Sequence, residues 1–261
     1  GINKGQSFGN LFLAALNGIT GSFEEAVTRM NEVLAVTGKV LPVTNANVDL
    51  VADFENGASV VGESKIAAKK KQQNCRIHQV RLEPQKPKAL PHAIDAILSA
   101  DMIILGPGSL YTSIIPNLLV DGIVQALEKS KAPKIYVLNI MTQDGETEGY
   151  TAFDHLHALL QHSAPHLVDA CIYNTAPVPD PIQARYKTED AEPVEMDMQR
   201  FREAGVEMYG FPLIAGGSQL ARHDPALLAQ AVVNVFGRCC VREGIYGAYD
   251  VLARETEPGK I

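Results

Sequence analysis

The hydrophobic pattern of the first ninety residues changes from helical spacing to short strand-like runs. A very apolar stretch at residues 7–17 predicts a buried helix. A second helix is expected to begin after Ser22, because Ser22 and Glu25 have the spacing of a capping box. The Asn56-Gly57 pair between two apolar runs is typical of a β-hairpin. Strands are predicted at residues 39–44, 48–54, 59–66 and 77–82.

From residue 91 onward the pattern becomes a regular alternation of strands and helices. Helices are predicted at residues 91–100, 119–128, 152–161, 196–203 and 225–236. Strands are predicted between them at residues 102–105, 134–141, 168–174 and 206–214. Continuous apolar strands that alternate with helices are typical of parallel sheets. We therefore expect an α/β fold with a mainly parallel sheet covered by helices on both faces.

Two segments fit neither pattern. The lysine run at residues 69–71 is expected to be a solvated loop, with phosphate binding as a minor alternative. The proline-rich stretch at residues 177–181 is expected to be irregular, because proline interrupts both helices and strand ladders.

Composition restricts the classes of function. The 261 residues are 46% hydrophobic, which excludes a disordered chain, and the net charge of −7 leaves no basic surface for general nucleic-acid binding. The apolar runs are too short to cross a membrane, no secretory signal is recognised, and the four cysteines lack C-x-x-C spacing. We therefore expect a cytoplasmic protein that binds anions through helix N-termini and a few cations.

Three polar loops that contain glycine follow predicted strands, at the edge of a parallel sheet where ligands bind. In the first loop, Gly106 and Gly108 let the backbone approach a ligand, while Ser109 and Thr112 add hydroxyl donors at a helix start. Such a loop can cradle phosphate groups. An ordinary strand-to-helix turn explains the pattern equally well, and the ending of a Walker A loop is absent.

Asn139 lies near the end of the predicted strand at residues 134–141, and the second loop carries Thr142, Gln143 and Glu146 directly after that strand. These polar groups could read a base or sugar edge, and Glu146 could act as a general base or hold a cation. The alternative is that they only complete turns. For Thr151 and Asp154, which follow, a helix capping box is the favoured interpretation.

The third loop precedes the last predicted helix and carries Arg222, His223 and Asp224. A guanidinium group beside a loop that contains glycine suits a diphosphate, with which it can pair in a bidentate manner. A single histidine is more often structural than catalytic, and Asp224 is expected to cap the helix. We assign no catalytic residue, and the spacing of the histidines does not favour a zinc site.

Several blocks of the sequence resemble one protein family. They are Ser7 to Leu16, Gly38 to Pro42, Gly62-Glu63, Gly106 to Asn117, Asn139 to Thr147, Asn174 to Pro177 and Arg222 to Asp224. The blocks GPGSLYTSIIPN and NIMTQDGET are long and uncommon. Through them the chain resembles the YvcK-type gluconeogenesis factors, which belong to the superfamily of the phospholactate transferase CofD.

The resemblance implies a Rossmann-like fold that binds a nucleotide diphosphate. In the YvcK branch the ligand is UDP-N-acetylglucosamine, and the protein is a cytoplasmic regulator of cell shape, cell-wall peptidoglycan synthesis and growth on gluconeogenic carbon sources. In the transferase branch a phospholactyl group moves from a guanosine diphosphate donor to a deazaflavin, with Mg²⁺. The ligand-site residues that the resemblance implies are Asn10, Gly106, Gly108, Ser109, Thr112, Thr142, Gln143, Glu146 and Arg222.

Two features of the family do not occur in this sequence. They are the glycine-rich G-G-G-T-G turn after the first strand and the acidic A-D-D-G-G-S block. We expect residues 1–238 to form a single CofD-like domain that lacks this glycine-rich strand and turn, and residues 239–261 to be a tail without assignment. A homodimer and protein partners in regulation are expectations from the family.

Three functions stay open at this point. A regulator that binds a UDP-sugar without turnover is favoured, and it would need no cofactor. The alternative is an enzyme of the phospholactate transferase type, with Mg²⁺ as its cofactor. The third is a scaffold for a protein partner. Nucleic-acid binding and membrane insertion are not expected.

Overall fold

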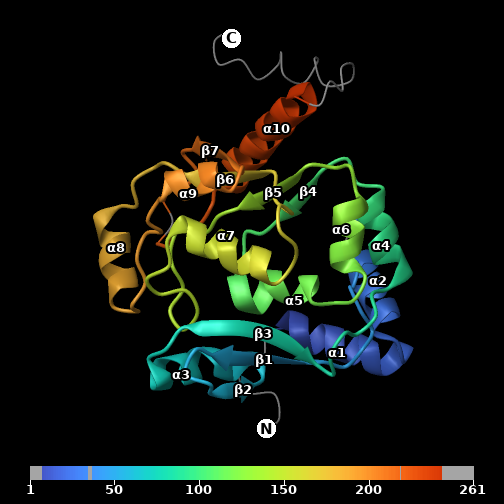
Figure 1. Ribbon diagram of the computed structural model, residues 1–261. Helices are drawn as coiled ribbons and strands as arrows, with labels where there is room; N and C mark the ends of the chain where they lie inside the picture. Colours follow the sequence, from blue (N-terminus) through green and yellow to red (C-terminus); the bar gives the residue numbers. More distant parts are fainter. Residues whose placement is uncertain (1–7, 35–36, 218, 243–261) are drawn as a thin grey trace.

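The computed structural model describes residues 8–34, 37–217 and 219–242, which form two sheets with helices on and between them (Figure 1). The helices are α1 (Phe8–Thr20), α2 (Phe23–Val33), α3 (Glu63–Gln73), α4 (Pro91–Leu98), α5 (Ile115–Leu118), α6 (Ile123–Lys129), α7 (Ala152–Gln161), α8 (Asp180–Lys187), α9 (Met198–Glu203) and α10 (Pro225–Arg242), with a π-helical turn η1 (Leu110–Ile114). The strands are β1 (Asp49–Phe54), β2 (Ser59–Val61), β3 (Ile77–Glu83), β4 (Ile103–Leu105), β5 (Lys134–Val137), β6 (Ala170–Asn174) and β7 (Glu207–Phe211).

The larger sheet is parallel, with its strands in the order β4-β5-β6-β7. Side chains alternate between its two faces, as the pleat requires. On one face Ile135 and Ile172 pack in a cluster with Val235 of α10. On the other face Tyr136 shares the main core with Leu156 of α7. Helices therefore cover both faces, which confirms the α/β fold predicted from the sequence.

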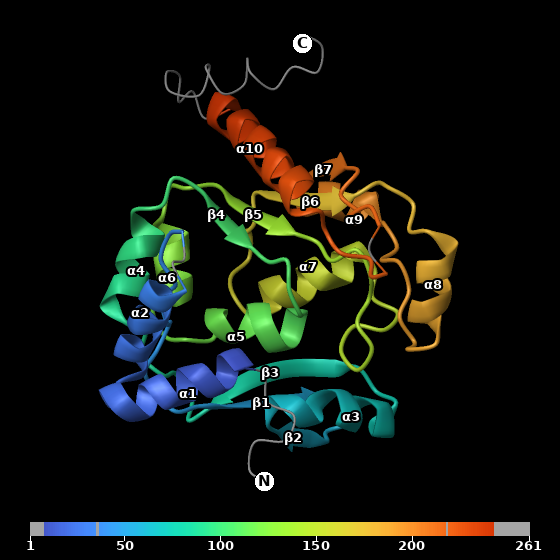
Figure 2. The same ribbon diagram turned by 180° about the vertical axis from the view of Figure 1, so that it is seen from behind.

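The smaller sheet is antiparallel, with the order β2-β1-β3, and its hairpin turns at the predicted Asn56-Gly57 pair. Helices α5 and α7 lie between the two sheets, as the views from the front and from behind both show (Figures 1 and 2). The backbone N–H of Val80 in β3 donates to Nε2 of His162 at the end of α7, at 2.9 Å. The smaller sheet is thus joined to the larger one through a shared helical layer.

Four predictions about local structure were wrong. The strand expected at residues 39–44 does not form. The strand expected at residues 59–66 stops at Val61, and α3 begins at Glu63, where the buried Ile66 faces the sheet. The lysine run therefore lies in the last turn of a helix rather than in a loop, because lysine and glutamine are good helix formers. The proline-rich segment also contains a helix, α8, with Pro181 in the first turn, where proline is tolerated.

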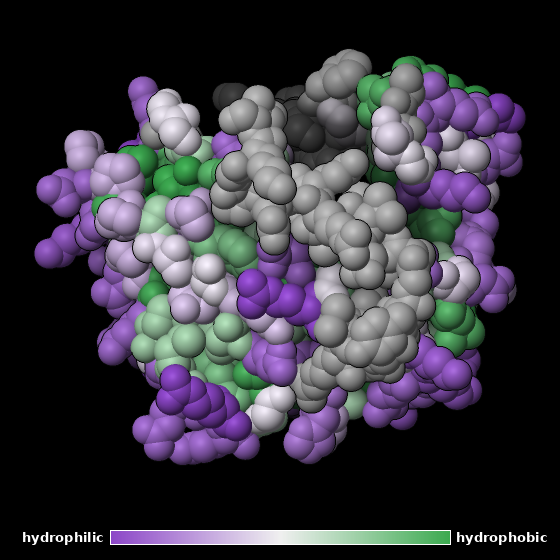
Figure 3. Space-filling model, turned by 90° about the horizontal axis from the view of Figure 1, so that it is seen from above, coloured by the Kyte–Doolittle hydropathy of each residue, from purple (hydrophilic) through white to green (hydrophobic). Residues whose placement is uncertain are grey.

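Helix α1 forms as predicted, but it is not buried. None of its side chains within the described part of the chain is buried, and Ile19 is 81% exposed. An apolar run predicts a helix, yet it carries no information about which element will cover it. Apolar patches among polar side chains are also visible on the face seen from above (Figure 3). Leu227 and Val233 of α10 are exposed as well. Across residues 8–34, 37–217 and 219–242, no helix is long and apolar enough to cross a bilayer.

Candidate functional site

The first candidate loop turns sharply after β4. Gly106 has φ = +85°, and a Cβ atom there would lie 3.0 Å from the carbonyl oxygen of Val137 and 3.1 Å from a methyl group of Ile114. Glycine is therefore required by both conformation and space. The chain then enters η1, and within the described ranges the N–H groups of Gly108 and Ser109 donate to no protein acceptor. Such N–H groups are suited to an anion.

The second candidate loop is hydrogen-bonded to the first through Glu146. One carboxylate oxygen accepts from the backbone N–H of Tyr111 at 3.2 Å, and the other accepts from the Thr112 hydroxyl at 2.8 Å and from the Gln143 amide at 3.1 Å. The residue is only 3% exposed. Burial raises the pKa of Glu146 above its usual value, and the hydrogen bonds from Thr112 and Tyr111 oppose that shift. Glu146 thus holds the two loops together with both oxygens occupied.

Thr142 is likewise engaged by the protein. Its backbone N–H donates to the Glu192 carbonyl at 2.7 Å, and its hydroxyl accepts from the Glu192 N–H at 2.9 Å. The preceding Met141 forms an antiparallel bridge with Pro193. The second loop is therefore paired with the segment that follows α8, and Thr142 is buried within this pairing.

A cavity of about 240 Å³ opens at the carboxyl ends of β5 and β6. Its polar side chains are the amides of Asn139, Asn174 and Gln183, and its apolar wall includes Tyr173 and Val178. The Asn139 amide also donates to the Gly108 carbonyl at 2.9 Å, which connects the cavity with the first loop. The Asn174 amide is engaged with backbone groups through both its oxygen and its nitrogen, and the Gln183 amide donates to the Val178 carbonyl. The amide oxygens of Asn139 and Gln183 can still accept from a sugar or a base.

The third candidate loop follows β7 and folds back on itself. The Ala215 N–H donates to the Arg222 carbonyl at 3.0 Å, and Ile214 pairs with His223. Ala221 packs in a small apolar cluster with Ile140, at the start of the second loop. The Arg222 side chain is exposed and forms no ion pair with a described residue. The three predicted loops thus gather at one edge of the parallel sheet.

The neighbouring His223 is half-buried, and its Nε2 atom has no hydrogen-bond partner among the described residues. Burial lowers the pKa of His223, and a backbone hydrogen bond with Leu138 opposes that change. Leu138 follows β5 and lines the cavity. Asp224 caps α10 as predicted, because its carboxylate accepts from the N–H groups of Ala226 and Leu227.

One implied site residue, Asn10, cannot be placed at this edge of the sheet. Asn10 lies in the first turn of α1, and its side chain is outside the described residues. Conversely, the cavity residues Asn174 and Gln183 were not among the predicted site residues. Asn174 ends a predicted strand, a position that could have drawn attention to it. Gln183 follows the proline-rich stretch, and no sequence motif marked it as a site residue.

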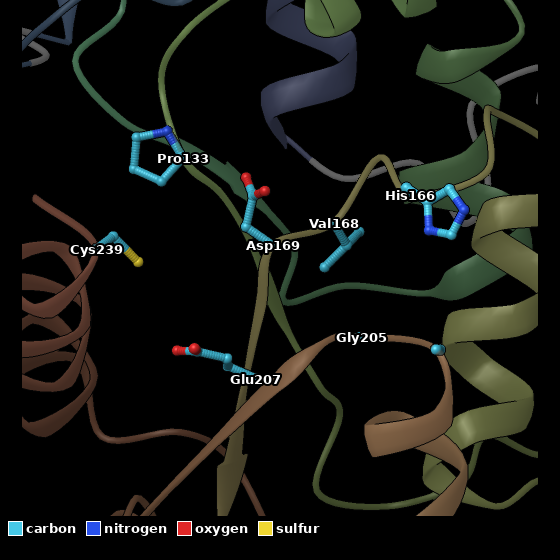
Figure 4. A pocket seen from close by; sticks show the side chains of 8 residues that line it. Pro133, His166, Val168, Asp169, Gly205, Glu207 and Cys239 are labelled. Atoms are coloured by element: carbon cyan, nitrogen blue, oxygen red, sulfur yellow. The ribbon is translucent and has the colours of Figure 1, made fainter. Parts of the chain in front are cut away.

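A second cavity, of about 340 Å³, lies at the opposite edge of the sheet, where the strands begin. Asp169 and Glu207 precede or begin strands there, and Cys239 reaches it from α10 (Figure 4). The two carboxylates point in different directions (Figure 4), and that of Asp169 accepts from the backbone N–H of Lys134 at 2.8 Å. Ligands of α/β sheets bind at the carboxyl ends of strands, so the first edge is the better candidate.

In the part of the chain that the structure describes, no group of three or more histidine, cysteine, aspartate or glutamate residues is placed to hold a metal ion.

The parallel sheet, its covered faces and the loops at its carboxyl edge define a Rossmann-like α/β protein. A family model described as "2-phospho-L-lactate transferase CofD" matches residues 2–214. The chain belongs to this CofD family. It is 45% identical over 231 residues to the gluconeogenesis factor of Bacillus subtilis (strain 168), covering 88% of this chain and 72% of that protein.

A further relative and a solved structure are similar to this chain over comparable shares of their length. The gluconeogenesis factor of Halalkalibacterium halodurans is 41% identical over 231 residues, which cover 88% of this chain and 70% of that protein. A crystal structure of a Bacillus halodurans protein superimposes with a TM-score of 0.82 at 41% identity, over 88% of this chain and 72% of that chain.

Proposed function

We propose that this chain is a cytoplasmic regulator that binds UDP-N-acetylglucosamine and acts on cell shape, peptidoglycan synthesis and gluconeogenic growth. The names of its relatives support the link with gluconeogenesis. The proposed ligand follows from the family resemblance, and the arrangement of the three loops supports it.

The observation that carries this proposal is the meeting of three different ligand-binding features at one sheet edge. The Asn139 amide joins the first loop to the 240 Å³ cavity, while Ala221 holds the third loop against the second. The N–H groups of Gly108 and Ser109 can donate to a diphosphate, and the Arg222 guanidinium adds positive charge. The amide oxygens of Asn139 and Gln183 can accept from hydroxyl or N–H groups of a sugar or base.

Calorimetric titration of the full chain with UDP-N-acetylglucosamine tests this proposal. We expect saturable heat and a ligand-dependent rise in Tm, because a ligand that binds only the folded state stabilises it by mass action. UDP-glucose and GDP serve as controls for the sugar and the base. No heat and no change in Tm at millimolar ligand would overturn the proposal.

The second candidate is a transferase of the phospholactate type, which the description of the matching family model favours. The chain would then move a phospholactyl group from a guanosine diphosphate donor to a deazaflavin. Incubation of the protein with the donor, the deazaflavin and Mg²⁺ decides between the candidates: we expect no product, and its appearance would favour the transferase.

A further inference from the structure

Helix α3 of the smaller sheet contacts the second candidate loop through two lysines of its last turn. The ammonium of Lys70 pairs with the carboxylate of Glu148, and that of Lys71 pairs with Asp144. The Lys70 side chain is 10% exposed, whereas Lys71 is half-exposed. The preceding lysine, Lys69, is half-buried, and its ammonium donates to Gln72 on its own helix. The three lysines of the run therefore have three different environments.

The backbone of the loop lies directly on the same helix. Gly145 has φ = +78°, and a Cβ atom there would lie 2.3 Å from the Cβ of Ala67. The second carboxylate oxygen of Glu148 accepts from the Gly145 N–H. Burial acts to raise the pKa of Glu148, but the hydrogen bonds from Lys70 and Gly145 outweigh it and leave that pKa below its usual value. One chain of contacts thus runs from Lys70 through Glu148 to the turn at Gly145.

The residue after this turn is Glu146, which holds Tyr111 and Thr112 of the first loop. A shift of the turn away from α3 would therefore carry the Glu146 carboxylate away from the η1 backbone. The loop after β5 reaches down to α3 in both ribbon views (Figures 1 and 2). Lys71 contacts the same loop through Asp144, whereas Lys69 pairs with Gln72 of its own helix.

We propose that α3 fixes the ligand-binding conformation of the second loop, with Lys70 as a positioning residue that acts through Glu148. Lys70 touches no ligand; it holds the turn that aims Glu146 at the first loop. This inference rests on the proposed function for the identity of the ligand. It assigns a role in ligand binding to the smaller sheet, which lies on the other side of the helical layer.

The test compares Lys70→Met with Lys69→Met in the full chain. Lys69→Met is a matched control, because it removes the same charge from the neighbouring position without touching the loop. For Lys70→Met we expect amide hydrogen exchange in residues 110–114 and 142–149 to become about tenfold faster, while β1 and β3 keep their protection. We expect affinity for UDP-N-acetylglucosamine to weaken about tenfold or more. Lys70→Arg should restore both.

A second variant, Glu148→Gln, removes the same ion pair from the other side and preserves side-chain size. It should accelerate exchange in the same residues, and it replaces Lys70→Met in the test if that variant is too unstable. Unchanged exchange in the loop, or equal acceleration throughout β1 and β3, would overturn the inference, because it would show no role or only a general role in stability. If the unmodified chain binds no nucleotide, the proposed function fails, and the exchange experiment alone decides on the role of Lys70.

Discussion

Arg222 stands in the third loop beside Ala221, whose side chain packs against the start of the second loop. Its guanidinium is exposed, so its removal leaves no buried group without a partner. For Arg222→Ala we therefore expect an unchanged Tm and an affinity for UDP-N-acetylglucosamine about ten- to a hundredfold weaker, the loss of one charged contact of about 1.5–3 kcal/mol. Calorimetry measures the affinity, and thermal unfolding measures the Tm.

Arg202 provides the control for this prediction. It is also exposed, but it lies on α9 ahead of β7, toward the opposite edge of the sheet. Arg202→Ala should leave the affinity unchanged. Equal affinities of the Arg222 variant and the unmodified chain would remove Arg222 from the ligand site.

Loss of the hydroxyl group from two buried tyrosines should have different effects on the free energy of unfolding. Tyr136 is fully buried in β5, and its hydroxyl has no hydrogen-bond partner among the described residues. The Tyr111 hydroxyl lies 2.8 Å from that of Tyr150, and both residues are buried. We expect Tyr136→Phe to leave the free energy of unfolding unchanged or to raise it, whereas Tyr111→Phe lowers it by about 1–2 kcal/mol by leaving Tyr150 unpaired.

Urea denaturation of the two variants measures these free energies under one set of conditions. Because each substitution removes a single oxygen from a buried ring, the comparison isolates the hydrogen bond from the loss of packing. A larger loss for Tyr136→Phe than for Tyr111→Phe would contradict the prediction.

At the scale of the elements, the contact between α7 and β3 depends on a neutral histidine. In His162 the Nδ1–H donates to the Ala158 carbonyl at 2.7 Å, so Nε2 is free to accept from the Val80 N–H. Burial lowers the pKa of His162, the bond to Ala158 opposes this, and the nearby His78 adds to it. Protonation would place a second donor against Val80 and break this contact.

The sign of the pH effect follows from the lowered pKa. The unfolded chain takes up a proton below about pH 6.5, whereas folded His162 does so only at a lower pH. The free energy of unfolding should therefore fall as the pH drops below about 6.5. In His162→Gln, where the amide can accept and donate without titrating, we expect a shallower fall. Denaturation series at several pH values measure this difference, and parallel curves for the two proteins would contradict it.

Local signals in the sequence predicted most element boundaries. Ser22 caps α2 with its side chain, and Thr151 forms the expected capping box with Asp154 at the start of α7. Such caps depend on residues three positions apart, so a single sequence contains all that is needed. The strand-helix alternation from β4 to β7 was equally clear because each buried strand is a continuous apolar run.

Features that depend on distant residues were not predictable. The position of Glu146 could be read as a site, but its hydrogen bonds to Tyr111 and Thr112 join residues more than thirty positions apart. The burial of Lys70 likewise depends on Glu148, which no local pattern relates to it. The exposure of α1 depends on what lies next to it. In each case the missing information was a tertiary contact.

At the scale of the whole molecule, one hydrophobic cluster contains members of both sheets. Phe54 and Ile77 of the smaller sheet belong to the same core as Leu156 of α7 and Tyr136 of the larger sheet. Because neither sheet has this core to itself, we expect a single cooperative unfolding transition, which is the behaviour of one domain. Far-ultraviolet circular dichroism and tyrosine fluorescence should give the same midpoint, and the sequence contains no tryptophan to mask the tyrosines. Two separate midpoints would show that the sheets unfold independently.

The close approach of Gly145 to Ala67 also restricts how this sequence can diverge. Any side chain at position 145 would occupy space that Ala67 fills. Glycine at position 67 would not relieve the clash, because the same Cβ atom would still lie 2.6 Å from the Cα atom of residue 67. Position 145 should therefore stay glycine in every relative that keeps this contact between helix and loop, whichever residue stands at position 67.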